Sequence, residues 1–245
     1  MFSFFKQKPK LKDIIPRNYI DIHSHILPGI DDGSKNLEDT LFLTNAMKKL
    51  GFEKCITTPH IIQGVWNNTH EIIQTLEQKT IIDFKNNNHH FTVKAAAEYL
   101  MDLEFLKLFQ KERLLTIKDD YVLVEMSYIN APMQLYEILF ELQIAGYKPI
   151  LAHPERYLFY FSNFENYTKL KNAGCLFQLN LLSSVGYYGE GVLKLAIKLL
   201  ENGMIDFVGS DIHHERHVNA FNLPLQLKNS KALEEAFERN NLFNF

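Results

Sequence analysis

Short apolar runs alternate with amphipathic segments along almost the whole chain. The helical segments have recognisable starts and stops: Ser34 or Asn36 can cap a helix that ends before Gly51, and Thr69 can cap the next one. Alternation of strands and helices predicts parallel pairing through right-handed crossovers, and therefore an α/β fold. The expected strands are 19–25, 55–60, 92–99, 121–126, 148–153, 176–180 and 205–211, and the expected helices are 36–50, 69–86, a short one from 103, 130–143, 164–173, 191–201 and 231–239.

Seven strand and helix units come close to a (β/α) barrel. Tyr121 to Val124 is apolar throughout, which fits a strand buried on both faces. An open doubly wound sheet is the alternative, and it would gather functional residues at one switch point. Here residues able to bind metals end strands throughout the sequence, which favours the barrel.

The carboxyl ends of the expected strands carry the candidate chemistry. Parallel strands in a barrel bring these ends to one rim, where barrel enzymes place their active sites. Histidine, aspartate and glutamate make up roughly one residue in six, so one such strand end means little, but six of the seven carry one. The sixth strand ends in Asn180 instead. The residues at the other ends are His23, His25, His60, Glu98, Glu125, His153, Asp211 and His213.

This set predicts a cluster of metal ions. Mixed imidazole and carboxylate ligands suit Mn²⁺, Fe²⁺, Zn²⁺ or Co²⁺, and the set exceeds what one ion needs, so two or three ions are expected. A closed structural zinc site would need cysteines or one compact tetrahedron. Bridged metal ions near arginine indicate hydrolysis of a phosphate ester. His70, His89 and His90 are expected at the surface. His214 and His217 follow the last strand end, near the rim of the barrel, and the sequence does not assign them a role.

Composition narrows the class of protein. The 245 residues carry a net charge of −3, so no strong basic field favours nucleic acid. Cys55 and Cys175 lie in apolar runs without C-x-x-C spacing, which indicates a reducing, cytoplasmic location. No apolar run approaches the ~20 residues of a membrane span. Residues 1–18 are expected to be an N-terminal extension, and 19–245 a single domain.

The motifs together resemble one known family. The opening run from Asp21 to Gly33, DIHSHILPGIDDG, is similar to that of PHP (polymerase and histidinol phosphatase) proteins. Its Asp31-Asp32-Gly33 extension resembles the bacterial capsule-type tyrosine-protein phosphatases of that superfamily. The later matching blocks, which extend the resemblance over about residues 19–217, are 57–60 (TTPH), 97–99 (AEY), 124–127 (VEMS), 152–157 (AHPERY) and 210–213 (SDIH).

The resemblance implies a distorted (β/α)7 barrel with a trinuclear metal site, most readily of Mn²⁺. Carried over by position, His23, His25 and Asp211 hold one ion, and Glu98 bridges to a second, which Glu125 and His153 complete. The resemblance assigns the third ion to Asp32, His60 and His213. By the same resemblance, Arg156 and Arg216 match phosphate-binding arginines.

The same resemblance implies a protein-tyrosine phosphatase that uses a metal-activated hydroxide. The implied substrate is the tyrosine-rich tail of an autophosphorylating kinase that controls capsular or exopolysaccharide synthesis. The oligomeric state stays open.

Three other functions remain to be weighed. A histidinol-phosphate phosphatase or a nuclease of the same superfamily would share the ligands. A metal-dependent amidohydrolase would often use a carboxylated lysine as its bridging ligand, whereas Glu98 and Glu125 end the middle strands here. A scaffold without activity would have lost ligands, and none is missing.

Overall fold

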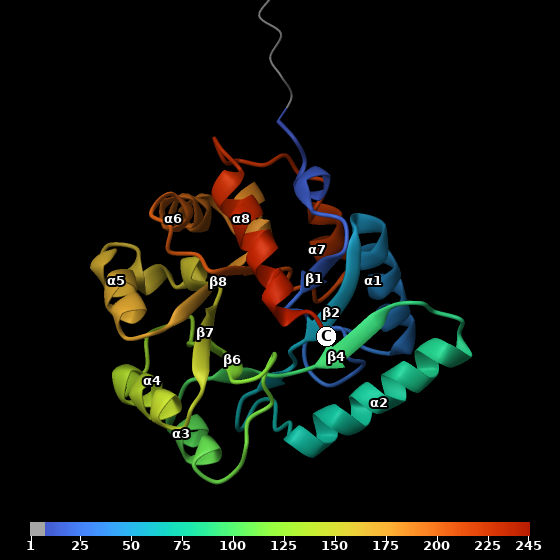
Figure 1. The fold of residues 1–245 in the computed structure, drawn as a ribbon, viewed down its shortest axis with the longest axis horizontal. Helices are drawn as coiled ribbons and strands as arrows, with labels where there is room; N and C mark the ends of the chain where they lie inside the picture. Colours follow the sequence, from blue (N-terminus) through green and yellow to red (C-terminus); the bar gives the residue numbers. More distant parts are fainter. Residues whose placement is uncertain (1–7) are drawn as a thin grey trace, which may run out of the picture.

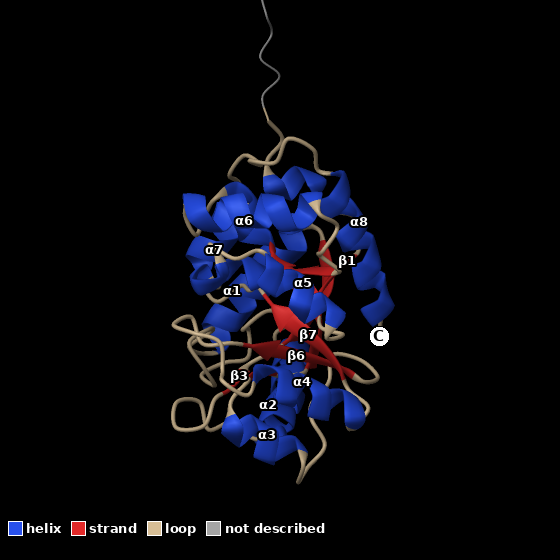
Figure 2. Ribbon diagram, turned by 90° about the vertical axis from the view of Figure 1, so that its left-hand side faces the viewer, coloured by secondary structure: helices blue, strands red, loops and turns tan. Residues whose placement is uncertain are grey.

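The computed structural model describes residues 8–245, and the expected α/β alternation is present throughout them. Helices lie around a set of central strands (Figures 1 and 2). The strands are β1 (Tyr19–Asp21), β2 (Phe52–Thr57), β3 (His60–Ile61), β4 (Thr92–Ala95), β5 (Glu98–Leu100), β6 (Tyr121–Glu125), β7 (Lys148–Ala152), β8 (Leu176–Asn180) and β9 (Phe207–Gly209). The helices are α1 (Leu37–Leu50), α2 (His70–Asn86), α3 (Leu103–Phe109), α4 (Leu135–Ile144), α5 (Glu165–Asn172), α6 (Glu190–Glu201), α7 (Glu215–Ala220) and α8 (Lys231–Arg239).

The strands form two parallel sheets. One has the order β1-β2-β4 and the other β3-β5-β6-β7-β8-β9. Every pair of these strands runs parallel, as crossovers through helices require. Beyond β1, Ser24 forms a parallel bridge with Ile212, which follows β9. The two sheets therefore touch along this line.

Two of the expected strands are each divided in two. The second breaks into β2 and β3 at Thr58-Pro59, where proline has no amide hydrogen to donate to a sheet ladder. The third breaks into β4 and β5 at Ala96-Ala97. Hydrogen bonds still cross the breaks, because Ala96 N–H donates to the carbonyl of Thr57 and Glu98 N–H to that of Pro59. His60 and Glu98 therefore stay next to each other.

The helix boundaries follow local capping chemistry in most places. Asn36 caps α1 by accepting from Asp39 N–H, and Gly51 ends it with φ at 103°. Thr69 caps α2 through Ile72 N–H, as predicted. The helix expected over 130–143 begins later than predicted: α4 begins at Leu135, and the Asn130 side chain donates to the carbonyl of Ala131 instead of capping the helix. Helix α7 was not predicted from the sequence.

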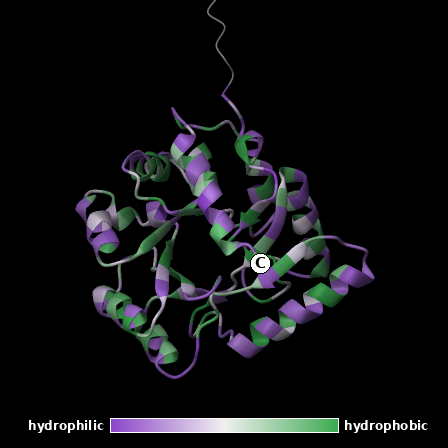
Figure 3. Cartoon of the chain, in the orientation of Figure 1, coloured by the Kyte–Doolittle hydropathy of each residue, from purple (hydrophilic) through white to green (hydrophobic). Residues whose placement is uncertain are grey.

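A small apolar cluster draws its members from both sheets. Ile20 and Ile56 come from β1 and β2, whereas Leu123, Ile150 and Phe207 come from β6, β7 and β9. Phe243, in the last turn of the chain, packs edge-on against Phe207, with ring centroids 4.8 Å apart. The rest of the core lies under the helices, which carry both hydrophobic and hydrophilic stretches (Figure 3).

The part of the expected extension that can be described is attached to the domain. Residues 1–7 lie outside the described residues. Leu11 is buried, and its N–H donates to the carbonyl of Leu223, while Lys10 bridges Pro224. Cys55 and Cys175 are buried and unpaired. Across residues 8–245, no helix combines the length and the apolar character that crossing a bilayer would require.

Candidate metal centre

The nine side chains expected from the sequence as metal ligands meet at one place. Their ligand atoms fall into four overlapping groups, and within each group all atoms lie within 4.8 Å of one another. The groups are His23-His25-Asp211, His23-Glu98-His153, His60-Glu98-Glu125 and His25-Asp32-His60-His213. Residues that lie far apart in the sequence therefore build a single cluster at the carboxyl ends of the strands.

The histidines after β1 point their Nε2 atoms into the cluster. The Nε2 atom of His23 lies 3.3 Å from Oδ1 of Asp211, and that of His25 lies 3.5 Å from the same oxygen. Their Nδ1 atoms face outward: that of His23 lies 2.7 Å from Gln178 Oε1, and that of His25 lies 2.7 Å from Asp31 Oδ2. An acceptor on Nδ1 fixes the tautomer that leaves Nε2 free to bind a metal.

Glu98 lies at the centre of the cluster and is fully buried. Its Oε2 atom lies 3.2 Å from His23 Nε2 and 3.2 Å from His60 Nδ1, while Oε1 lies 3.1 Å from His153 Nε2. Burial alone would raise its pKa, but His23 and His60 beside it hold that pKa well below the usual range. The carboxylate is thus ionised and lies within 3.5 Å of four histidines, as a bridging ligand would: His23, His25, His60 and His153.

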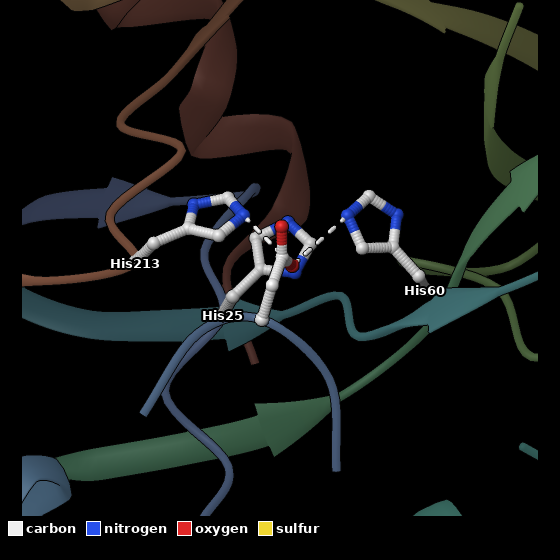
Figure 4. Close-up of side chains that lie close together, drawn as sticks. His25, His60 and His213 are labelled. Carbon is white, nitrogen blue, oxygen red and sulfur yellow. Dashed lines mark ion pairs between the residues drawn. The ribbon is translucent and has the colours of Figure 1, made fainter. Parts of the chain in front are cut away.

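A second part of the cluster opens toward solvent. Asp32 Oδ1 lies 3.5 Å from His60 Nε2 and 3.5 Å from His213 Nε2. His60 and His213 flank His25 (Figure 4), and the rings of His25 and His213 stack with centroids 3.9 Å apart. Asp32 is half exposed, whereas His25 is completely buried. Asp32, His60 and His213 therefore line the cavity, whereas His25 is buried behind them.

His60 Nδ1 lies 2.9 Å from Glu125 Oε1 and 3.2 Å from Glu98 Oε2. Even so, several buried polar atoms of the cluster make no well-aligned hydrogen bond among the described residues: His60 Nδ1, Glu98 Oε2, Glu125 Oε1 and His153 Nδ1. Burial of an unpaired polar or charged atom is costly, and native proteins rarely leave such atoms unmatched. Divalent cations would resolve the cost at the oxygens and imidazoles, because carboxylate and imidazole are the ligands that Mn²⁺, Zn²⁺ and Fe²⁺ accept. The residues therefore fit a metal cluster.

Two of the candidate ligands have unusual backbone conformations. His153 has φ at 37° and Asp211 has φ at 51°, both in the left-handed region. Such residues cost about 1–3 kcal/mol each and persist where the surroundings over-determine them. Asp211 is held on several sides, since its N–H donates to the His23 carbonyl and its Oδ2 accepts from Asn180 Nδ2 at 2.9 Å. The strain thus coincides with the functional cluster.

Arg156 stands at the edge of the cluster. Its Nη1 donates to Asp211 Oδ2 at 2.8 Å, and its guanidinium carbon lies 4.8 Å from the ring centre of Tyr128 and 4.4 Å from that of Tyr188. Arg156, Tyr128 and Tyr188 line the same cavity of about 230 Å³ as Glu98 and His153. A fixed arginine beside a metal cluster is suited to a phosphate group.

Other expected residues lie differently. Arg216 is exposed on α7 and is not among the residues that line the cavity. His214 and His217 do line it, and His217 Nδ1 lies 3.0 Å from the Asp211 carbonyl. Burial lowers the pKa of His217 to about 3, so this side chain is neutral. His89 contacts the Thr44 hydroxyl, away from the cluster.

Sequence reasoning missed the residues that orient the ligands. Asp31 and Gln178 each hold a ligand histidine, while Tyr128 and Tyr188 enclose Arg156. Asp31 had a signal, since it precedes Asp32 in the opening motif. Gln178 also had one, because it lies two residues before Asn180 at a strand end, where side chains share a face. Nothing in the sequence marks the two tyrosines.

Comparison with known proteins gives a consistent result. Residues 19–226 match the family described as capsular polysaccharide synthesis, CpsB/CapC. The chain is 29% identical to the tyrosine-protein phosphatase YwqE of Bacillus subtilis over 82% of this chain and 79% of that protein. It is 30% identical to the tyrosine-protein phosphatase CpsB of Streptococcus agalactiae over 80% of this chain and 83% of that protein.

Solved structures point the same way. One match comes from crystal structures of YwqE from Bacillus subtilis and CpsB from Streptococcus pneumoniae, which are described as unique metal-dependent tyrosine phosphatases. The TM-score is 0.78 at 27% sequence identity, and the match covers 91% of this chain and 90% of that one. The zinc-bound histidinol phosphate phosphatase of Lactococcus lactis matches with a TM-score of 0.52 and 13% identity, over 94% of this chain and 95% of that one, which shows a shared fold.

Proposed function

The chain belongs to the CpsB/CapC family, and we propose that it is a metal-dependent phosphatase that removes phosphate from phosphotyrosine in a protein. One observation carries the proposal. Asp211 faces His23 and His25 with one carboxylate oxygen and holds Arg156 with the other. A candidate metal ligand and a phosphate-binding arginine are thereby fixed to each other in one cavity.

We propose two or three ions, with Mn²⁺ as the first choice and Fe²⁺, Zn²⁺ or Co²⁺ as alternatives. One ion would take His23, His25 and Asp211, and the mouth would take Asp32, His60 and His213, which matches two of the observed groups. For the ion bridged by Glu98, His153 lies nearer His23 and Glu125 nearer His60, so these two ligands approach Glu98 from different sides.

The residues divide the work of ester hydrolysis among them. Bound divalent ions supply charge neutralisation and a water activated for attack on phosphorus. Arg156 presents planar donors to the phosphate oxygens, and its position is set beforehand by Asp211, Tyr128 and Tyr188, which favours electrostatic stabilisation of the transition state. The products are inorganic phosphate and tyrosine.

The two cysteines are not suited to act as nucleophiles. Both are buried, and burial raises the pKa of Cys55 well above its usual value and that of Cys175 to about 12. A reactive cysteine needs a lowered pKa and access to substrate. Activation of water, rather than a covalent phosphoenzyme, therefore fits the chain.

Competing chemistries find less support. Among residues 8–245 no lysine lines the cavity, and we assign to Glu98 the bridging position that a carboxylated lysine takes in many amidohydrolases. Histidinol phosphate would fit a phosphate site in general, but the relatives at 29–30% identity carry the name tyrosine-protein phosphatase. We propose the tyrosine-rich tail of an autophosphorylating kinase of capsule synthesis as the substrate. A cytoplasmic location fits the two buried, unpaired thiols.

We further infer that the strands form one distorted (β/α)7 barrel. In support, β2 with β3 and β4 with β5 each act as one interrupted strand, the Ser24–Ile212 bridge links β1 to β9, and the small apolar cluster unites both sheets. We take residues 19–245 as one domain and 1–18 as its extension, because the family match starts at residue 19.

The proposal is tested with the purified full chain. After exhaustive chelation it should not hydrolyse a phosphotyrosine peptide, and added Mn²⁺ should restore the rate. Full activity in protein shown by elemental analysis to hold no metal would refute the proposal. Parallel assays on histidinol phosphate and a short oligonucleotide distinguish the alternatives.

A further inference from the structure

The mouth of the cavity is chemically uneven. Two segments of the loops that follow β6 and β7, residues 127–134 and residues 157–164, contain no charged side chain, although the loop after β7 begins with His153, Glu155 and Arg156. By contrast, Asp32 follows β1, His214 follows β9, and Arg216 lies on α7 directly after it. A substrate that enters the cavity therefore meets an uncharged border at one part of the mouth and a charged border at another.

The uncharged border exposes large apolar side chains. Ile129 is 84% exposed, Met133 93%, Leu158 56% and Phe161 45%. We call these four residues the apolar rim. Single exposed apolar residues are common, but a group of them beside a binding cavity marks an interaction surface. We therefore expect the apolar rim to bind a partner.

The two loops of the rim are joined to each other and to the cavity. The rings of Tyr128 and Tyr157 have centroids 5.9 Å apart, and Met126 N–H donates to the Tyr157 hydroxyl at 2.9 Å. Tyr128 is 47% exposed, lines the cavity and stacks on His153. The first residue of the rim, Ile129, thus directly follows Tyr128 of the cavity wall.

The apolar surface continues from the rim along α4. Tyr136, Phe140 and Ile144 recur every fourth residue, which places them on one face of the helix, and all three are at least 48% exposed. Helix α4 lies beside α5 around β7 (Figure 1). No lysine or arginine occurs between Met126 and Tyr147, so a phosphate would find no competing cation on this face.

We infer that the apolar rim docks the polypeptide of the substrate next to its phosphotyrosine, and that the substrate presents apolar side chains there. This inference rests on the proposed function. A phosphotyrosine held in the cavity leaves its own backbone at the mouth, and residues further along an extended chain lie roughly 3.3–3.6 Å apart, so the next few positions cross the rim. Because the rim has no charge, selectivity there comes from burial of apolar surface.

The test uses the full chain loaded with Mn²⁺ and three probes. Two are phosphotyrosine peptides that differ only in having leucine or serine at the positions flanking the phosphotyrosine, and the third is p-nitrophenyl phosphate. The variants are Ile129→Asp, Met133→Asp and Leu158→Asp. The matched control is Ile82→Asp, since Ile82 is equally apolar and 56% exposed but lies on α2.

The wild type should hydrolyse the leucine peptide with a kcat/KM about tenfold above that for the serine peptide. Each rim variant should lower kcat/KM for the leucine peptide by roughly three- to tenfold, mainly through KM, while rates on p-nitrophenyl phosphate stay within about twofold. Ile82→Asp should behave as wild type.

Equal rates on the two peptides, or rim variants that keep the preference for leucine, would overturn the inference. Sedimentation of the same proteins adds a second criterion: if the rim variants lose self-association but keep the peptide preference, the rim is a contact between copies and the inference is wrong. If the wild type hydrolyses neither peptide, the proposed function itself fails, which is a separate result from equal hydrolysis of both.

Discussion

Arg156 donates a hydrogen bond to Oδ2 of Asp211 at 2.8 Å, while Oδ1 of the same carboxylate lies 3.3 Å from His23 Nε2. One carboxylate thus belongs to the cluster of candidate metal ligands and also sets the direction of the arginine. The opposing charges of His23, His213 and Arg156 outweigh burial and hold the pKa of Asp211 well below its usual range. Substitution of either partner has distinct consequences.

Arg156→Ala should retain its metal but lose catalysis. In the proposed mechanism Arg156 contributes donors to the phosphate rather than ligands to an ion, so kcat/KM for a phosphotyrosine peptide should fall by about 10²–10³, the usual effect of removing a preorganised donor. Elemental analysis of the same sample supplies the control. An unchanged kcat/KM would remove Arg156 from the mechanism.

The aromatic rings on either side of Arg156 can be tested separately. Tyr188→Leu removes a ring whose centre lies 4.4 Å from the guanidinium carbon, and should lower kcat/KM about tenfold, within the range of cation–π contacts. Tyr188→Phe keeps the ring and loses only the hydroxyl that accepts a hydrogen bond from Asn180, so its kcat/KM should fall much less. Equal losses in the two variants would show that the hydroxyl, and not the ring, matters.

Gly33→Ala should disturb the cluster without altering any ligand. A Cβ at Gly33 would lie only 2.1 Å from the carbonyl oxygen of His25 and 2.5 Å from its Cβ, so the backbone that carries His25 must move. We expect lower metal content and a loss of activity. Gly191→Ala is the control, because its new Cβ would meet the side chains of Phe161 and Leu158 at 3.4 Å or more, and alanine suits a helix. Full metal content in Gly33→Ala would contradict this.

Bound metal should stabilise the folded protein. At a free Mn²⁺ concentration of about 100 times Kd, the gain is about 2.7 kcal/mol, which corresponds to roughly 5–10 °C in Tm for a chain of this size. Chelation should reverse the gain, as measured by calorimetry. Glu98→Gln should show a much smaller response, because the residue at the centre of the cluster is changed. An identical response in the variant would place the stabilising ion elsewhere.

The clustering of the candidate ligands could be predicted because it depends on two simple rules. Parallel strands bring their carboxyl ends together, and the residue types at those ends reveal the chemistry. His60 and Glu98 were found in this way although both lie after a break in their strands. The breaks could not be foreseen in full, because Ala96-Ala97 carries no local signal and the interruption depends on contacts with neighbouring strands.

The residues that enclose Arg156 could not be predicted from the sequence, for a physical reason. Tyr128 and Tyr188 reach Arg156 from different loops, and loop conformation depends on long-range packing rather than on periodicity. The same holds for α7, whose six residues give too short a pattern to detect. Arg216, which the family resemblance assigned to phosphate, lies exposed on that helix, and its role stays a prediction.

The most direct measurement is an anomalous difference map from crystals grown with Mn²⁺, combined with elemental analysis. We predict two or three peaks among His23, Glu98, His153, Asp211 and His213, with a metal content per chain that agrees. The absence of peaks there, or peaks only at other sites on the surface, would contradict the assignment of this cluster as a metal centre.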